Sequence, residues 1–160
     1  IVGQQISVKA AESVWQKVLG AMPDMTPRTI AAAEQNLLRT CGLSARKITY
    51  LQDLSWHFTE GNLNETTWNA MDDEAIIAQL TRVKGIGRWT AEMFLIFHLQ
   101  RPDVLPLDDI GLQRAISQHY FDKQPVNKKT ILALAKPWQP WRSVATWYLW
   151  RSLDPLPVAY

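Results

Sequence analysis

The sequence predicts an all-α fold, with about eight helices in two small lobes that flank a cleft. Apolar residues recur at intervals of three and four along almost the whole chain, as they do on the buried faces of amphipathic helices. Residues that favour helix N-termini precede several of these stretches, and no sustained apolar/polar alternation predicts a strand. The 160 residues, of which 47% are hydrophobic, suffice for one compact domain.

Each predicted helix has a start signal, a periodic apolar face or both. Thr26-Pro27 is typical of an N-cap with proline at the first helical position, and Ser44, Asn127 and the Asp72-Asp73 pair are further N-cap candidates. Glycine follows several of the apolar stretches, where it commonly ends a helix. The helices are therefore expected at about 6–20, 27–42, 44–61, 72–80, 88–98, 109–116, 127–134 and 141–153.

Composition narrows the class of protein. The single cysteine, Cys41, excludes a disulfide framework and a cysteine-ligated zinc or iron–sulfur site within this chain, and it favours a reducing compartment. The net charge of +2 permits a local basic face but does not establish nucleic-acid binding. There is neither a signal peptide nor a membrane-spanning run, and a helical pattern is already running at Ile1, so a fragment of a longer chain is expected.

Trp15, Trp56 and Trp68 lie among apolar neighbours and are expected in the core.

A glycine turn between two amphipathic helices is the most informative stretch. Gly85-Ile86-Gly87 lies between the helix that ends near Leu80 and the helix that carries Ala91. Glycines allow close approach of another surface, and the free N–H groups at the start of the second helix favour a phosphate. Lys84 and Arg88 add positive charge on either side. Taken alone, the turn is weak evidence for a phosphate site, and an ordinary tight helix–helix connection is the favoured interpretation.

An acidic pair, Asp108-Asp109, begins the helix that follows. Aspartate is a good N-cap and acids are favoured in a first helical turn, so a purely structural role is one interpretation. A carboxylate fixed at a helix N-terminus can also stabilise positive charge in a transition state, or orient and deprotonate water. The sequence alone leaves both roles open.

Four stretches together resemble the helix-hairpin-helix DNA glycosylases of base excision repair, the HhH-GPD superfamily. They are Ile1–Ser7, Gly42–Lys47, the turn from Val83 to Gly87, and Trp138–Ser143. They are most similar to the alkylation-repair branch, the DNA-3-methyladenine glycosylase II type. The resemblance implies that residues 1–160 form a catalytic core with its hairpin at 80–99. It also implies an enzyme that removes 3-methyladenine and 7-methylguanine from double-stranded DNA by hydrolysing the N-glycosidic bond.

The same resemblance assigns roles to individual residues. Asp109 would be the catalytic carboxylate, with Asp108 as the cap or a supporting neighbour. Members that also nick the backbone carry a lysine two residues after the second glycine of the hairpin; Trp89 stands there, which implies a monofunctional enzyme without lyase activity. The base pocket would comprise Trp89, Trp150, Met93 and Ile110. Since methylated purines are cationic, a stacked tryptophan would favour the damaged base.

The remaining implied contacts are with DNA and with an ion. The family's wedge, which fills the gap left by a flipped base, corresponds to Gln5. Residues expected to hold the DNA backbone are Ser44, Lys47, Lys84, Gly85, Gly87, Arg88 and Thr90. Backbone carbonyls of Thr81, Val83 and Ile86 would hold a structural Na⁺ or K⁺; no other cofactor, and no iron–sulfur cluster, is expected.

A monomer is expected, without a membrane partner, in the bacterial cytoplasm or nucleoid, or in the nucleus of a eukaryote. Two alternatives remain open from the sequence. One is a glycosylase of the same fold for another lesion, such as uracil, a thymine mismatch or hypoxanthine. The other is a DNA-binding module that has kept the hairpin and lost catalysis.

Overall fold

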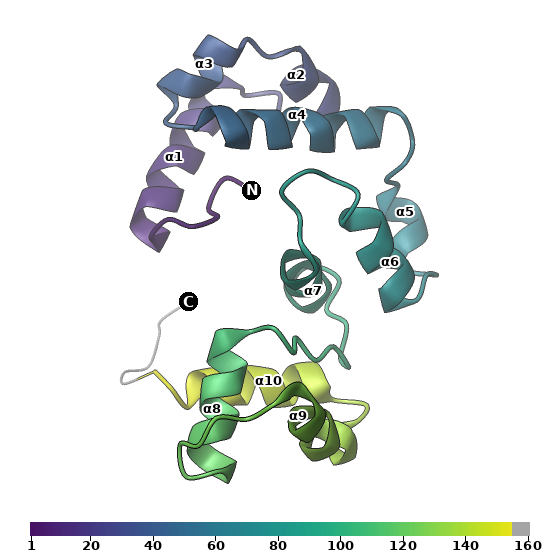
Figure 1. The fold of residues 1–160 in the computed structure, drawn as a ribbon. Coiled ribbons are helices and arrows are strands. Elements are labelled where there is room, and N and C mark those ends of the chain that lie inside the picture. The colour runs from purple at the N-terminus through teal and green to yellow at the C-terminus, as the bar shows by residue number, and fades with distance from the viewer. Residues whose placement is uncertain (155–160) are drawn as a thin grey trace. The chain divides into compact units, whose positions relative to one another are not determined.

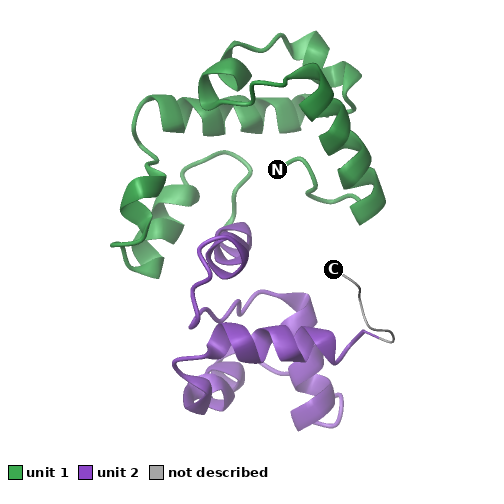
Figure 2. Cartoon of the chain, turned by 180° about the vertical axis from the view of Figure 1, so that it is seen from behind, with its two compact units in different colours: residues 1–87 green, residues 88–160 purple. Residues whose placement is uncertain are grey.

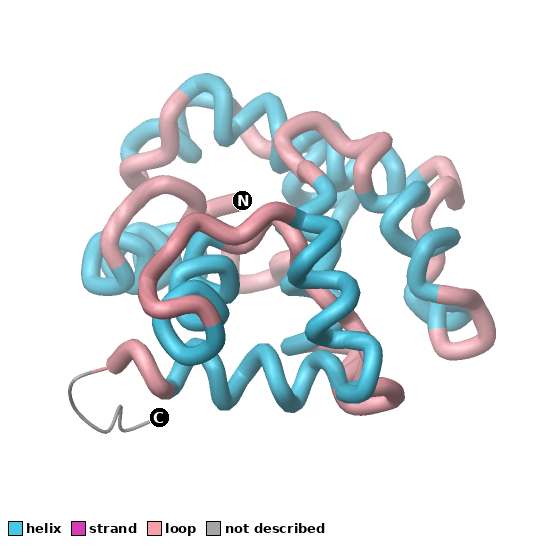
Figure 3. Tube along the Cα trace, turned by 60° about the horizontal axis from the view of Figure 1, so that its bottom comes forward, coloured by secondary structure: helices cyan, strands magenta, loops and turns pink. Residues whose placement is uncertain are grey.

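The computed structural model describes residues 1–154, which form ten α-helices and one 3-10 helix and contain no β-strand (Figures 1 and 3). The all-α prediction is therefore confirmed over that range. None of the helices in it combines the length and apolar character needed to cross a membrane. The chain divides into two compact units, unit 1 at residues 1–87 and unit 2 at residues 88–160 (Figure 2).

Unit 1 is built around the long helix α4. Its elements are α1 (Val8–Ala21), α2 (Pro27–Ala32), α3 (Gln35–Thr40), α4 (Ala45–Thr59), α5 (Glu65–Trp68) and α6 (Asp73–Leu80). Side chains of Ser7, Thr26, Ser44 and Asp72 accept a backbone N–H in the first turn of the helices that they precede, so each is an N-cap. Helices α2 and α3 pack against α4 (Figure 1). The core between α1, α3 and α4 contains Val18, Met22, Leu38, Cys41, Leu43 and Ile48.

Unit 2 contains α7 (Arg88–Phe97), α8 (Ile110–Tyr120), α9 (Lys128–Ala135), a 3-10 turn (Lys136–Trp138) and α10 (Arg142–Arg151). Asn127 caps α9, as predicted. Helices α8 and α10 pack together. Their core consists of Leu112, Ala115, Ile116, Ile131 and Leu149.

Two expectations about unit 1 were wrong, and one short helix was not predicted. The helix expected at 27–42 is two helices, because Ala33 and Glu34 are extended, with ψ of 135° and 134°. Ala33 packs against the core, so tertiary packing overrides its helix propensity. The single turn α5 was not predicted. Trp15 and Trp56 are exposed, since they lie on helix faces that turn away from the core; only Trp68 is buried, and its Nε1–H donates to Gln79 Oε1 over 3.0 Å.

In unit 2, an ion pair joins the start of α10 to the loop that follows α7. The Arg142 guanidinium donates from Nε to Asp103 Oδ1 over 2.7 Å and from its terminal nitrogen to Oδ2 over 2.8 Å. The Ser143 hydroxyl donates to the carbonyl of Arg101 over 2.6 Å and accepts the N–H of Val104 over 2.9 Å. These bonds fix α10 against the segment that leads to α8.

Replacement of Asp103 tests this anchor. Asp103→Asn is expected to lower the free energy of unfolding at neutral pH by about 1–2 kcal/mol, because a bidentate charged pair is lost. The guanidinium of Arg142 lowers the pKa of Asp103 below its usual range, and burial opposes this shift less strongly. A carboxyl with a lowered folded-state pKa stabilises the fold above its unfolded pKa of about 3.9, and the stabilisation is lost as the pH falls through the folded value.

Denaturant unfolding at pH 7 and in steps below pH 4 would measure both effects. The difference between wild type and Asp103→Asn should shrink in the acid range. Asp154→Asn, which removes an exposed ion pair with Arg151, is the control and should change little. A difference for Asp103→Asn that is constant with pH would contradict the account.

Candidate active site

Asp109 is the centre of the site in unit 2. It is the N-cap of α8, is only 9% exposed, and its Oδ1 accepts the backbone N–H of Leu112 over 2.6 Å. Oδ1 also accepts Nε1–H of Trp150 over 2.7 Å, and Oδ2 accepts Nε1–H of Trp89 over 2.8 Å. The structure thus brings together the three residues to which the sequence resemblance gave the chemistry and the principal pocket roles.

Each donor is carried by a separate helix of unit 2. Trp89 is in the first turn of α7, Trp150 is in the last turn of α10, and Leu112 is in the first turn of α8. The Arg142–Asp103 pair holds α10, and the N–H of Asp109 donates to the carbonyl of Pro106 over 3.0 Å. The carboxylate therefore has a defined position and orientation.

The two oxygens of this carboxylate differ in what they can still accept. Oδ1 takes two donors, which match its two lone pairs, whereas Oδ2 takes one. Hydrogen bonds to a charged acceptor are among the stronger ones in proteins. Oδ2 of Asp109 is thus the oxygen with capacity for one more partner. A fixed carboxylate of this kind can stabilise developing positive charge or take a proton from water.

Asp108 is arranged quite differently. Its side chain is 53% exposed and forms an ion pair with Lys128. The cap is Asp109, so the alternative that Asp108 caps this helix was wrong. The structural interpretation of Asp109 as an N-cap is therefore correct, and it does not compete with a chemical role for the same carboxylate.

Glycine at position 111 leaves room for the close packing of this carboxylate. A Cβ there would lie 3.1 Å from Asp109 Oδ1 and 3.1 Å from Cδ1 of Trp150. Both distances are shorter than ordinary van der Waals contacts, so a larger residue would push the indole and the carboxylate apart. Sequence reasoning missed Gly111, because nothing local in a helix predicts what packs against it.

Large apolar side chains lie exposed beside the carboxylate. Trp89 is 45%, Phe97 61% and Ile110 79% exposed, and the Phe97 ring stacks on Trp150 with centroids 5.9 Å apart and an interplanar angle of 15°. Clustered exposed apolar side chains on a soluble protein commonly mark a binding surface. Sequence reasoning missed Phe97, although its spacing from Trp89 and the half-buried Met93 places all three along one side of α7.

In unit 1, three residues from other segments contact the glycine turn. Gly85 has a φ of +81°, and a Cβ at this position would overlap the ring of Tyr50. Gln4 Nε2 donates to the carbonyl of Gly85 over 3.0 Å, and the N–H of Lys84 donates to Asp53 Oδ2 over 2.8 Å. The turn therefore needs glycine for its conformation and for the close approach of an aromatic ring.

The cations expected to meet DNA already have protein partners. Lys84 Nζ lies 3.2 Å from Asp53 Oδ1, Arg88 Nε lies 3.0 Å from Glu92 Oε1, and Lys47 Nζ donates to the carbonyl of Val2 over 2.7 Å. Thr90 is half-buried in α7, and Ser44 caps α4. Contact of these side chains with DNA stays a prediction.

Gln5 is exposed and has a φ of +59°, in the left-handed region that is unfavourable for residues other than glycine. Backbone strain of this kind is often concentrated at functional sites. The side chain of the neighbouring Gln4 instead donates to the carbonyl of Gly85, so the two glutamines differ in their contacts.

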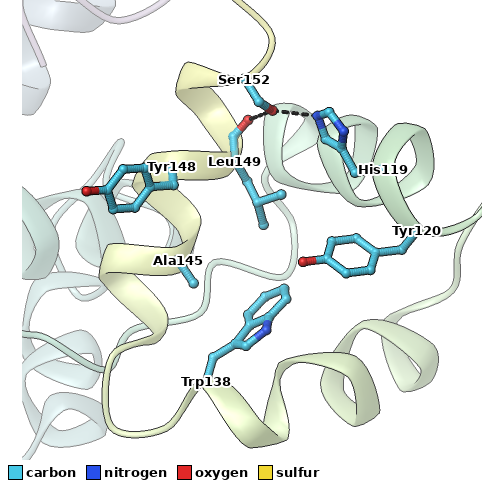
Figure 4. A pocket seen from close by; sticks show the side chains of 7 residues that line it. All are labelled: His119, Tyr120, Trp138, Ala145, Tyr148, Leu149 and Ser152. Atoms are coloured by element: carbon cyan, nitrogen blue, oxygen red, sulfur yellow. Dashed lines mark hydrogen bonds between the residues drawn. The ribbon is translucent and has the colours of Figure 1, made fainter.

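A pocket of about 320 Å³ with aromatic residues in its lining lies in unit 2 (Figure 4). Its lining includes neither Asp109 nor the two tryptophans that hold it. His119 Nε2 lies 2.7 Å from Ser152 Oγ, but the serine hydroxyl donates to the carbonyl of Leu149 over 2.7 Å. A serine hydroxyl that donates to a backbone carbonyl does not direct its proton to the histidine, so the pair lacks the arrangement of an activated nucleophile.

Metal-ligating side chains do not cluster within residues 1–154: no group of three or more His, Cys, Asp or Glu could hold an ion there. The predicted alkali ion would instead use backbone carbonyls of Thr81, Val83 and Ile86. Neutral oxygens of this kind suit a hard cation. Val83 O already accepts the N–H of Ile86 over 3.1 Å and has a second lone pair.

Comparison with known proteins agrees with the resemblance seen in the sequence. The family model of the HhH-GPD superfamily base excision DNA repair proteins matches residues 1–140. DNA-3-methyladenine glycosylase 1 of Schizosaccharomyces pombe is 36% identical over 95% of this chain and 68% of its own length. DNA-3-methyladenine glycosylase 2 of Escherichia coli is 31% identical over 94% of this chain and 54% of its own.

Two solved structures are also similar. A crystal structure of a DNA-3-methyladenine glycosidase from Bacillus halodurans has a TM-score of 0.89 and 36% identity, over 96% of this chain and 72% of that one. The S. pombe enzyme in complex with abasic DNA has a TM-score of 0.78 and 31% identity, over 98% and 79%. The chain spans between 48% and 73% of the length of the curated relatives that match more than four fifths of it.

The crowding at Gly111 gives a prediction about stability. Gly111→Ala is expected to lower the free energy of unfolding by about 1 kcal/mol, because overpacking outweighs the better helix propensity of alanine. Gly20→Ala, in α1, is the matched control: no atom lies within 4 Å of its Cβ position, so it should raise the free energy of unfolding by about 0.5–1 kcal/mol. Denaturant unfolding would compare them, and equal stabilisation by both substitutions would contradict the packing argument.

Proposed function

The chain belongs to the HhH-GPD superfamily of base excision DNA repair proteins, and we propose that it is a monofunctional DNA glycosylase for alkylated purines. The main support for this function is the buried Asp109 carboxylate, which accepts the indole N–H groups of Trp89 and Trp150 beside exposed aromatic side chains. The related enzymes named for 3-methyladenine support the choice of substrate class. The S. pombe relative, captured with abasic DNA, supports DNA as the partner.

Asp109 would act on the sugar of a nucleotide rotated out of the duplex. Breaking the N-glycosidic bond builds positive charge on that sugar. Oδ2 of Asp109, with its remaining lone pair, would stabilise this charge and orient or deprotonate the attacking water. The products are the free base and an abasic site.

The aromatic side chains would receive the base. An alkylated purine carries positive charge, which the electron-rich faces of Trp89 and Trp150 attract. Such a base is also a good leaving group, so the site does not require a strong general acid. Phe97 stacks on Trp150 and extends the same surface, whereas Met93 and Ile110 would supply aliphatic contacts.

The absence of lyase activity rests on Trp89. A glycosylase that also nicks DNA needs an amine to form a Schiff base with the sugar. Trp89 occupies the position where the bifunctional enzymes of the family carry that amine, and it uses its N–H to hold Asp109. We therefore assign the nucleophile to water.

The hairpin would grip a phosphate through backbone N–H groups at the start of α7, which also has the positive end of the helix dipole. An alkali ion on carbonyls of Thr81, Val83 and Ile86 would add positive charge there. Gln5 would fill the space left by the rotated base and bond its orphaned partner. We propose a monomer that acts in the bacterial cytoplasm or nucleoid, or in the nucleus of a eukaryote.

Methylated duplex DNA provides the direct test of this function. Wild-type protein should release 3-methyladenine and 7-methylguanine, and strand breaks should arise only after alkali. Asp109→Asn should reduce release by about a thousandfold or more, because the oxygens that face positive charge become a neutral amide. Asp108→Asn is the matched control: it removes a charge one residue away, on an exposed side chain, and should keep near-wild-type activity.

Duplex binding by all three proteins must be measured alongside, because it separates the alternatives. Release that survives in Asp109→Asn would contradict the catalytic assignment. Binding without release from methylated DNA would point to another lesion, which oligonucleotides containing uracil, a thymine mismatch or hypoxanthine would identify. Failure to act on any of these would indicate a binding module.

A further inference from the structure

We propose that Asp53, on α4, is the positioning residue that holds the DNA-binding turn 83–87 in its working conformation, and that Lys84 serves this anchor rather than a phosphate. The inference rests on the proposed function, because it concerns how that turn meets DNA. Asp53 lies outside the glycine turn in sequence, by 31 residues from Lys84, so no local motif reveals it.

Asp53 contacts Lys84 twice, and both contacts are within unit 1. Its Oδ2 accepts the backbone N–H of Lys84 over 2.8 Å, and its Oδ1 lies 3.2 Å from Lys84 Nζ. The Asp53 side chain is 14% exposed, whereas that of Lys84 is 66% exposed. A largely buried carboxylate therefore fixes both the backbone and the charge of the residue that directly precedes Gly85.

This arrangement changes what Lys84 offers to DNA. Its backbone N–H points toward α4 and is occupied, and its ammonium is neutralised by the carboxylate beside it. The phosphate then depends on the shape of the turn and on the N–H groups at the start of α7. Tyr50 beneath Gly85 and Gln4 on its carbonyl support the same conformation from other elements.

Charged groups near Asp53 are consistent with an ionised anchor. Burial raises the pKa of Asp53. The N–H and ammonium of Lys84, with a smaller contribution from His57, lower the pKa by more than burial raises it, so the pKa is below its usual range. His57 Nε2 lies 3.8 Å from Asp53 Oδ2, too far for a hydrogen bond. The structure therefore assigns the anchor to Lys84 and Asp53 as a pair.

The direction in which Asp53→Asn changes the affinity for DNA separates a positioning role from a purely electrostatic effect. Removing a negative charge near DNA should by itself tighten binding, because repulsion of phosphates falls. If Asp53 positions the turn, Asp53→Asn must instead weaken binding. Glu60→Gln is the matched control, since it removes one exposed negative charge at the end of the same helix without touching the turn.

The experiment measures binding of a fluorescently labelled undamaged duplex and base release from methylated duplex, by full-length variants. Asp53→Asn should raise Kd and KM together by about tenfold, while the single-turnover rate at saturating enzyme changes less than about twofold. Glu60→Gln should bind as tightly as wild type or tighter. Lys84→Met, which keeps the backbone bond to Asp53, should raise Kd less than Asp53→Asn does.

Equal or tighter binding by Asp53→Asn would overturn the inference and leave the proposed function intact. Wild-type protein that neither binds duplex nor releases base would overturn the proposed function, and the inference with it. Should Asp53→Asn fail to fold, the amide resonance of Lys84 in the wild type gives the answer. Its chemical shift should titrate with a midpoint below the usual aspartate value, and the amide should stay protected from exchange when undamaged duplex is added; an amide that neither titrates nor is protected would overturn the anchor.

Discussion

The hydrogen bonds that converge on the Asp109 carboxylate are the constraint on which the functional part of this protein depends. Two indole N–H groups and one backbone N–H, each from a different helix, meet at two oxygens. The same residue is the cap of α8, so the start of this helix and the proposed chemistry use the same carboxylate in the same place. Trp89 and Trp150 hold the carboxylate through their N–H groups. In the proposed function, their rings also contact the base.

Two other carboxylates fix elements of the fold, one in each unit. In unit 2, Asp103 binds Arg142 and holds the helix that carries Trp150. In unit 1, Asp53 binds Lys84 and holds the glycine turn. Both acids have a pKa below the usual range, as expected for carboxylates that remain charged in a folded protein. Both acidic residues thus serve as internal anchors of the fold.

Much of the fold and of the candidate site could be predicted from the sequence. Features set by local interactions could be predicted, whereas features set by contacts between distant residues could not. Caps at Ser44 and Asn127 are local, and the pattern revealed them. Asp109 was identified by resemblance, as was Trp150. The break at Ala33 could not be predicted, because core packing outweighs helix propensity there. Phe97, Gly111 and Asp53 depend on contacts between residues distant in sequence, and a single sequence does not contain those contacts explicitly.

The most direct measurement of the central claim removes the indole donors but keeps aromatic rings. Trp89→Phe and Trp150→Phe should each lower the single-turnover rate of base release by about tenfold, with little change in duplex affinity, because a freed carboxylate loses its orientation toward the sugar. Trp138→Phe, in the pocket of Figure 4, should match wild type. Rates unchanged in both donor variants would contradict the claim that the indole N–H groups orient Asp109 for catalysis.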